Sequence, residues 1–407
     1  MRTGTLNNMP IKFFRLICSL ILLTVSATHS YAQSSQFFDQ LDGMFDASEY
    51  LSENAYGFLP VPIIITDPAV DGGLGMMGLF FHETEEEKAV RLKAMKKSET
   101  AAMHLLPPSV SAAIGAYTGN DSYFVGVGHM GFFNQGKIRY MGGGGYGDIN
   151  IDFFGFGDIV LPKPISINTK ATAVMQTLKF KLADSSFYLG PTHRYINAEI
   201  SPKNINDLIG NLPPEWHDPL TEVLTRNVTT SGVGFTLEYD SRDNFFSPSQ
   251  GLKYDLTSLW FDETVGSDVD YLLTEFTGLH YLKFNKHWRT AFRIEVNYAD
   301  ADDFLPPYAT PYIDMRGIPA ARYQGKSVAM SELELIYQFN LRWTMNVFTG
   351  IGKASNQLSE LNSSASRISK GVGFRYLIAR RYGFNMGIDI AKGPEDTVFY
   401  IQAGSAW

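Results

Sequence analysis

The chain has 407 residues, enough for two ordinary domains or one large barrel, and it is rich in aromatic residues (14%) but poor in charged ones (19%). Its net charge of −8 argues against nucleic acid as a partner, because an acidic surface repels a polyanion. Beyond the N-terminus no run of 18 or more apolar residues occurs, which excludes a membrane-spanning helix there.

Residues 1–32 have the organisation of a secretory signal peptide. An apolar core, Leu16 to Ala27, follows three positive residues and precedes a small-x-small cleavage site that ends at Ala32. The core is too short for a membrane anchor. Cleavage would remove Cys18, the only cysteine, and three positive charges, so we expect a mature chain without thiol chemistry and with a net charge of −11.

Residues 33–57 form a short acidic segment with scattered aromatic residues. We interpret it as a periplasmic segment, either partly helical or acting as a plug. It is too short to be a separate domain. From residue 58 to residue 407 the chain breaks into short segments separated by turn signals, and we expect this part to form one domain.

These segments alternate apolar and polar residues with the period of a β-strand. Between Glu332 and Arg342, for example, one face carries Leu333, Leu335, Tyr337, Phe339 and Leu341, and the other carries mainly charged and amide residues. A water-soluble sandwich would show the same alternation. The number of segments, their length and the aromatic residues at their ends favour a transmembrane antiparallel β-barrel, whose strands need roughly 9–11 residues.

We predict about sixteen strands, which satisfies the even number expected of a bacterial barrel with both ends in the periplasm. Their predicted positions are 60–66, 73–82, 109–118, 122–133, 137–150, 166–182, 186–200, 228–241, 251–262, 269–284, 287–300, 328–342, 343–353, 370–380, 382–391 and 396–407. Long outer loops then fall at 151–165, 201–227, 301–327 and 354–369, and the inner turns are short. The exception is 83–108, for which we expect a solvated helix with an ion pair between Glu87 and Arg91.

One loop differs from the others in composition. Residues 312–325 (YIDMRGIPAARYQG) contain Pro319 and follow three more prolines, so they cannot form a paired central strand. The segment is too apolar to look disordered, and it carries Arg316 and Arg322 among small residues. We interpret it as an ordered loop that folds into the barrel lumen, with Arg316 as its anchor.

Three motifs resemble those of the BamA/TamA-like outer-membrane assembly barrels, the bacterial surface-antigen superfamily. Met315-Arg316-Gly317-Ile318 resembles the (V/I)RG(F/Y) motif of the sixth outer loop in that family. The inner turn DSRDNFFSPSQG is similar to the D-x-R-x-x-x-x-P-x-x-G turn; its matching residues are Asp240, Arg242, Pro248 and Gly251. The last segment, FYIQAGSAW, looks like the terminal strand that is recognised during assembly; its matching residues are Phe399, Ile401, Gly404 and Trp407. Only about 25 residues separate the predicted cleavage site from the barrel, so the chain resembles the small subgroup without periplasmic POTRA domains.

The resemblance implies that Arg316, with Gly317 and Arg322 beside it, locks the loop into the lumen by pairing with acids on the next two strands. Glu334 matches the first acid and faces the lumen by alternation. The second acid would fall near Gly350, where none is present, and Glu332 is the substitute. The alternative is that Arg316 is a solvated loop residue.

The sequence predicts neither an enzyme nor a metal or cofactor site. The eight histidines form no close metal-spaced pair, and the GGGG run at 142–145 lacks the GK[ST] of a phosphate-binding loop. A phospholipase would need a nucleophilic serine beside a histidine. His129 and His280 could lie on a suitable face, but no G-x-S-x-G motif is present.

Three functions follow from these observations. The resemblance implies a factor that assists insertion or translocation of proteins or lipids through a weak seam between the first and last strands. The alternatives are a passive pore or transporter for small solutes and a structural surface antigen. We expect the partners to be outer-membrane lipid and lipopolysaccharide, the barrel assembly machinery during biogenesis, and a client protein. The expected location is the outer membrane of a Gram-negative cell, reached by secretory export. The sequence does not identify the client, the solute or the oligomeric state.

Overall fold

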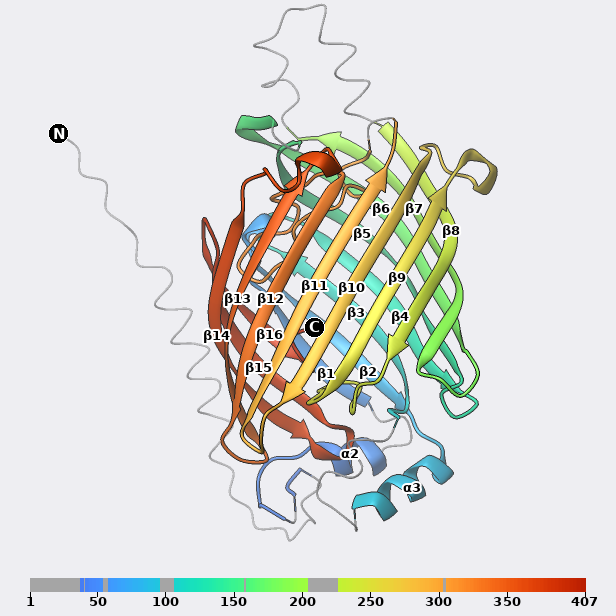
Figure 1. Ribbon diagram of the computed structural model, residues 1–407, viewed down its shortest axis with the longest axis vertical. Helices are drawn as coiled ribbons and strands as arrows, with labels where there is room; N and C mark the ends of the chain where they lie inside the picture. Colours follow the sequence, from blue (N-terminus) through green and yellow to red (C-terminus); the bar gives the residue numbers. More distant parts are fainter. Residues whose placement is uncertain are drawn as a thin grey trace, which may run out of the picture.

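The computed structural model describes residues 37–39, 41–53, 58–95, 106–156, 159–203, 226–302 and 305–407 (Figure 1). The predicted signal peptide, its cleavage site and most of the predicted loop at 201–227 lie outside these residues. Within them, sixteen antiparallel strands follow one another around a nearly closed barrel, as the alternation predicted.

Each strand pairs with its neighbours in chain order. The strands are β1 (Phe58–Ile65), β2 (Gly73–His82), β3 (Ser109–Thr118), β4 (Tyr123–Phe133), β5 (Ile138–Phe156), β6 (Ile159–Lys181), β7 (Phe187–Pro202), β8 (Arg226–Asp240), β9 (Gly251–Phe261), β10 (Tyr271–Lys283), β11 (Trp288–Asp300), β12 (Ser327–Gln338), β13 (Trp343–Ser355), β14 (Arg367–Ala379), β15 (Phe384–Lys392) and β16 (Thr397–Ala403).

Side-chain exposure alternates along the strands and separates an apolar outer face from a polar interior. In β13, Trp343, Met345 and Val347 are exposed, whereas Thr344 and Asn346 between them are buried. The same alternation places many large apolar side chains of the other strands on the outside. A water-soluble protein buries such side chains, so this inverted distribution indicates that lipid surrounds the barrel.

Several predicted boundaries are wrong, among them the end of β12, which lies at Gln338 and not at residue 342. The predicted outer loop at 151–165 is largely a hairpin, because β5 extends to Phe156 and β6 begins at Ile159. The predicted last strand, 396–407, is too long. β16 ends at Ala403, and Gly404 adopts a left-handed conformation (φ 85°) that directs the following residues away from the wall.

The two edges of the sheet, β1 and β16, meet without a ladder among the described residues, whereas each of the fifteen other neighbouring pairs has one. Thr66, just after β1, donates a side-chain hydrogen bond to the carbonyl of Phe399 in β16. We call the line between β1 and β16 the seam.

Two helices, α2 (Ser48–Glu53) and α3 (Glu85–Met95), lie at the end of the barrel where the parity of the strands places the periplasm (Figure 1). In the described part of the chain no helix is long and apolar enough to cross a bilayer. The helix expected within 83–108 is α3, but Arg91 Nε lies 2.6 Å from Glu83 Oε1 instead of pairing with Glu87 as expected. Glu87 accepts hydrogen bonds from Thr84 at the start of the helix.

Candidate functional site

The long loop between β11 and β12 folds into the barrel. Its two halves are held together by the Tyr312–Gln324 bridge and by a hydrogen bond from Ile313 N to Tyr323 O (3.0 Å). An apolar cluster then attaches the loop to the wall; its buried members are Ile313, Met315, Ile318, Val328 and Met330. Met315 and Ile318, on either side of Arg316 and Gly317, both belong to this cluster, so the loop is fixed where it presents the Arg316 side chain to the polar interior.

Arg316 meets three carboxylates that are themselves buried. Its Nη1 lies 2.8 Å from Glu334 Oε2 and 2.9 Å from Asp389 Oδ2, and its Nε lies 3.3 Å from Glu332 Oε1. The contact with Glu334 is an ion pair without hydrogen-bond alignment, since Glu334 Oε2 has no hydrogen-bond partner among the described residues. The guanidinium also stacks 3.5 Å above the Phe348 ring, which shields it from water.

Glu332 is shared by three separate elements. Besides Arg316 of the loop, it contacts Arg293 Nη1 of β11 at 3.2 Å and accepts a hydrogen bond from Trp407 Nε1 at 2.9 Å. Its side chain is fully buried. A buried carboxylate needs such partners, because desolvation without them would strongly destabilise the charge. The position of Glu332 therefore couples the loop, the wall and the C-terminal residues.

The second acid of the lock lies on a strand that the sequence did not indicate. Asp389 of β15 forms a two-point contact with Arg375 (2.6 and 2.8 Å) and also reaches Arg316. Gly350, where we looked for this acid, lies opposite Glu332 in the ladder. A Cβ there would collide with Met315 Sδ and approach Glu332 Cγ to 2.8 Å, so the missing side chain provides room for the loop.

Gly317 and Arg322 join the loop to the turn between β15 and β16. Gly317 has a φ of 86°, and its N–H donates to the Tyr400 hydroxyl at 2.8 Å. A Cβ at Gly317 would lie 3.0 Å from the backbone nitrogen of Gly393, so a larger residue would push the loop away from the turn. Arg322 Nη2 lies 3.4 Å from Glu395 in the same turn, in a more exposed position.

The inner turn between β8 and β9 is held by its own motif residues. Asp240 accepts from Arg242 Nε (2.9 Å) and from Arg139 of β5 (3.0 Å). Gly251 has a φ of 111°, and a Cβ there would collide with the Ser241 carbonyl, so glycine is needed where β9 begins.

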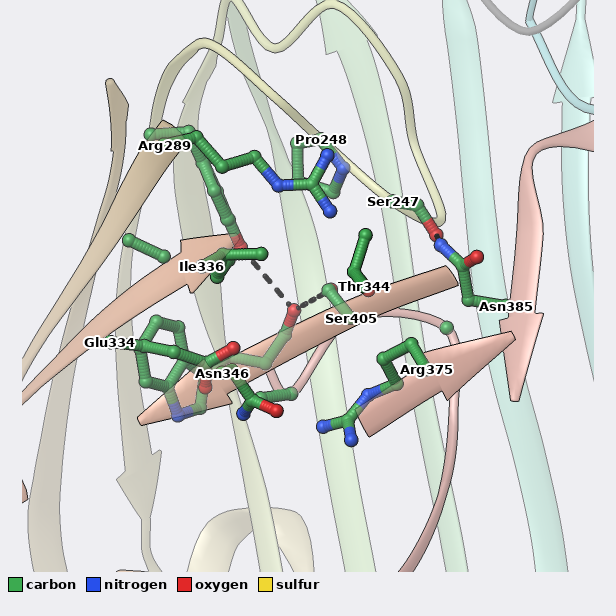
Figure 2. A pocket seen from close by; sticks show the side chains of 15 residues that line it. Ser247, Pro248, Arg289, Glu334, Ile336, Thr344, Asn346, Arg375, Asn385 and Ser405 are labelled. Carbon is green, nitrogen blue, oxygen red and sulfur yellow. Dashed lines mark hydrogen bonds between the residues drawn. The ribbon is translucent and has the colours of Figure 1, made fainter. Parts of the chain in front are cut away.

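The C-terminal residues leave the wall after Gly404 and enter the lumen next to this inner turn. Ser405 N donates to the Phe246 carbonyl at 2.7 Å, and Asn385 of β15 donates to Ser247 at 2.7 Å. A cavity of about 30 Å³ remains between these segments and the wall. Figure 2 shows the side chains that line it. Its lining includes Pro248 of the inner turn, Trp407 and the lock residue Glu334.

The three motifs are therefore neighbours in space. Arg316 and Trp407 share Glu332, and the inner turn holds the segment that carries Trp407. Phe399 and Ile401 remain on the outer side of β16, with Phe399 exposed. Sequence reasoning missed Asp389, Arg375, Arg293 and Phe348. The inward alternation of their strands was the one available signal.

A serine between two histidines lies elsewhere, on the outer face near the periplasmic end. Ser111 Oγ is 2.8 Å from His82 Nε2 and 2.9 Å from His129 Nδ1. A catalytic histidine also needs a group that orients it. In the described part of the chain no carboxylate makes a hydrogen bond to either ring, so we assign no hydrolytic role to Ser111.

The family of the chain follows from a comparison with known proteins. The Omp85 superfamily domain matches residues 165–407, more than half of the chain and the part that carries all three motifs. The chain belongs to the Omp85 superfamily. It is an outer-membrane β-barrel of this family, as the resemblance predicted. A search of curated proteins finds no match.

Solved Omp85 barrels share the fold at low sequence identity. BamA from Haemophilus ducreyi lacking POTRA domains 1-3 matches with a TM-score of 0.51 and 13% identity, over 85% of this chain and 69% of that chain. CdiB from Acinetobacter baumannii (TM-score 0.53) and CdiB from Escherichia coli (0.52) each match at 9% identity over 85% of this chain. The match spans 59% and 62% of those two CdiB chains.

Proposed function

We propose that this Omp85 barrel assists the insertion or translocation of proteins, or of lipids, at the outer membrane, and that the seam between β1 and β16 is the place where it opens. The observation that carries the proposal is the missing ladder between these two strands in the described residues. A client strand or a lipid can enter between two strands only where no continuous set of backbone hydrogen bonds has to break.

The sequence of β1 supports an edge that does not pair. Pro60 and Pro62 both lie within its ladder with β2, opposite Gly78 and Met76. Proline has no N–H, and in a sheet it is tolerated where that position faces away from the partner strand. Two residues apart, both prolines remove donors from the same side of β1. The side that faces β16 is therefore poor in donors.

Side-chain contacts, instead of a ladder, bridge the seam at both ends. At the outer end the loop donates from Ala320 N to Asp67 beside β1 (3.2 Å) and from Gly317 N to Tyr400 of β16. At the periplasmic end Tyr382, next to β15, donates to Glu83 beside β2 (3.2 Å). A buried apolar cluster reinforces this end; its members include Leu51 of α2, Leu59 and Val61 of β1, and Phe384 of β15. Such contacts can separate one by one.

A seam disulfide tests the proposal. Cysteines are introduced at Thr66, just after β1, and at Phe399 in β16 of the mature chain, which lacks other cysteines once Cys18 is removed. The matched control joins Val61→Cys to Met77→Cys, which face each other in the β1–β2 ladder. Liposomes that contain the protein should accelerate the folding of a small client barrel diluted from urea, relative to empty liposomes. The seam disulfide should reduce the acceleration about tenfold, with recovery on reduction, whereas the control disulfide should have no effect. Equal activity of both disulfides would overturn the proposal.

The second candidate, a passive pore, is favoured by one observation. A cavity of about 240 Å³ lies between the loop and the wall, with Arg194, Glu275 and Glu295 in its lining. A pore predicts stable single-channel steps that increase when residues 312–325 are deleted. The proposed assembly role predicts little conductance before the deletion, and it requires no catalytic group. In this role we expect lipid and lipopolysaccharide around the barrel and the assembly machinery as a partner during biogenesis.

A further inference from the structure

The segment before α2 has an unusual distribution of polar and apolar side chains. Residues 37–39 and 41–46, which we call the hook, form a small hairpin with an antiparallel bridge between Phe38 and Phe45. Position 40 lies outside the described residues. The hook reaches the inner turn between β12 and β13 and the one between β14 and β15, below the barrel wall (Figure 1).

Three carboxylates of the hook point toward the barrel and form ion pairs with one guanidinium group, that of Arg342. Arg342 lies 2.6 Å from Asp39, 2.6 Å from Asp42 and 2.6 Å from Asp46, one carboxylate at each of its nitrogens. Its side chain is only 2% exposed. Arg380 adds an ion pair to Asp39, and its backbone N–H donates to Asp46 at 3.1 Å. Multiple charge-assisted contacts of this kind fix orientation as well as position.

The apolar side chains of the hook are more exposed than its acids, and Phe37 also stacks against Phe45 and against Tyr50 of α2. Five large side chains are 39–59% exposed; they are Phe37, Phe38, Leu41, Met44 and Phe45. By contrast, Asp39 and Asp46 are below 10% exposed. In a segment surrounded by water the acids would face solvent and the aromatic rings would pack on the barrel. The hook therefore exposes its apolar side chains and buries acidic ones, as the barrel wall exposes apolar side chains and buries polar ones.

The exposed face of the hook continues the lipid-facing band. Tyr376 lies on the outer side of β14, meets the Trp343 ring edge to face with centroids 4.8 Å apart, and donates its hydroxyl proton to the Phe45 carbonyl at 2.7 Å. Tyrosine and tryptophan at strand ends mark the boundary between lipid tails and headgroups. The hydrogen bond from Tyr376 therefore places the hook at the depth of the periplasmic headgroups.

We propose that the hook forms an interfacial anchor that inserts its aromatic face into the periplasmic leaflet of the bilayer, while the contacts of Arg342 with Asp39, Asp42 and Asp46, the Arg342 clamp, hold its acidic face on the barrel. The occupant of the exposed face is lipid, because that face joins the lipid-facing girdle through Tyr376. The carboxylates, which would repel anionic headgroups if free, are neutralised by arginines of the barrel.

Single-cysteine variants labelled with an environment-sensitive fluorophore test the anchor in nanodiscs that each hold one barrel. The hook carries Leu41→Cys, the positive reference is Phe374→Cys on the lipid-facing side of β14, and the aqueous reference is Ser363→Cys in an outer turn. With brominated lipid, Leu41→Cys should be quenched at least threefold more than Ser363→Cys. Aqueous iodide should quench Ser363→Cys more strongly than Leu41→Cys.

The clamp is tested by adding Arg342→Gln to the Leu41→Cys variant. Quenching by brominated lipid should then fall toward the aqueous reference, with the heat-modifiable barrel still present on gels. Iodide quenching of the hook equal to that of Ser363→Cys would overturn the anchor. Protection from iodide without quenching by brominated lipid would also overturn it, because that pattern indicates a protein surface over the hook. Neither result depends on assembly activity, so it is separate from the proposed function.

Discussion

Substituting Arg316 by alanine is the sharpest test of the lumenal lock. The change leaves Glu334 without its ion-pair partner, whereas Asp389 keeps Arg375 and Glu332 keeps Arg293. Removing one partner of a buried ion pair destabilises a protein by about 3–5 kcal/mol. Because two of the three carboxylates retain a partner, we expect the lower limit, about 3 kcal/mol. At the roughly 2 °C per kcal/mol of larger domains, the thermal midpoint on heat-modifiability gels should fall by about 6 °C.

Two further variants separate the lock from a general effect of the loop. Arg322→Ala removes a similar side chain from the same loop, but its partner Glu395 is 3.4 Å away and partly exposed. Such pairs contribute about 0–1 kcal/mol, so the midpoint should move by 2 °C or less. The double variant Arg316→Ala with Glu334→Gln removes the stranded charge as well and should recover at least half of the loss. If Arg316→Ala behaves like Arg322→Ala, or if the double variant recovers nothing, the lock does not stabilise the loop.

Three other changes probe neighbouring contacts. Trp407→Phe keeps an aromatic ring but loses the indole hydrogen bond to a buried carboxylate, and this should cost about 1.5–3 kcal/mol in urea unfolding. Gly350→Ala introduces a Cβ against the loop and should lower the free energy of unfolding by about 1–3 kcal/mol. In the control Gly115→Ala, the added Cβ would have its nearest neighbour at 3.8 Å, so the free energy of unfolding should change by less than about 0.5 kcal/mol. Equal effects of the two substitutions would contradict the packing argument. A hydrogen bond from Arg342 lowers the pKa of Asp42 below its ordinary 3.8, and arginine contacts outweigh burial and also lower the pKa of Asp39. Hook docking should therefore be at full strength above about pH 4 and weaken progressively as the pH falls further, as limited proteolysis would show.

Alternation predicted the barrel and the inward direction of Glu334, because a strand shows its faces at every second residue. It could not predict Asp389 as the second acid. Asp389 lies on β15, three strands after Glu334, and it meets Arg316 because the loop extends along the inner side of the wall past Phe348 of β13. The position of an acid within a strand is visible in the sequence, but how far the loop reaches along the wall is not.

Two of the boundary errors involve prolines and a glycine. Residues 151–165, where we expected a loop, contain Pro162 and Pro164. Both fall in the irregular part of the β5–β6 ladder, where the register shifts and no backbone partner is required. Gly404 looked like part of the last strand, whereas its positive φ ends that strand and turns Trp407 inward.

The contacts of the loop on the two sides of the seam differ in strength, and this difference predicts how the seam would open. On one side, Arg316 is bound to β12 and β15 by three buried carboxylates, and Gly317 packs against the turn before β16. On the other side, the described contact with the β1–β2 turn is a single hydrogen bond from Ala320 N to Asp67. Asp67 is a carboxylate, so this hydrogen bond is charge-assisted too, but it acts alone, whereas three buried charge-assisted contacts act together on the other side. In the proposed opening, the loop would therefore remain with β12–β16 while β1 separates from it, so that Asp67→Ala should ease opening and Arg316→Ala should instead release the loop.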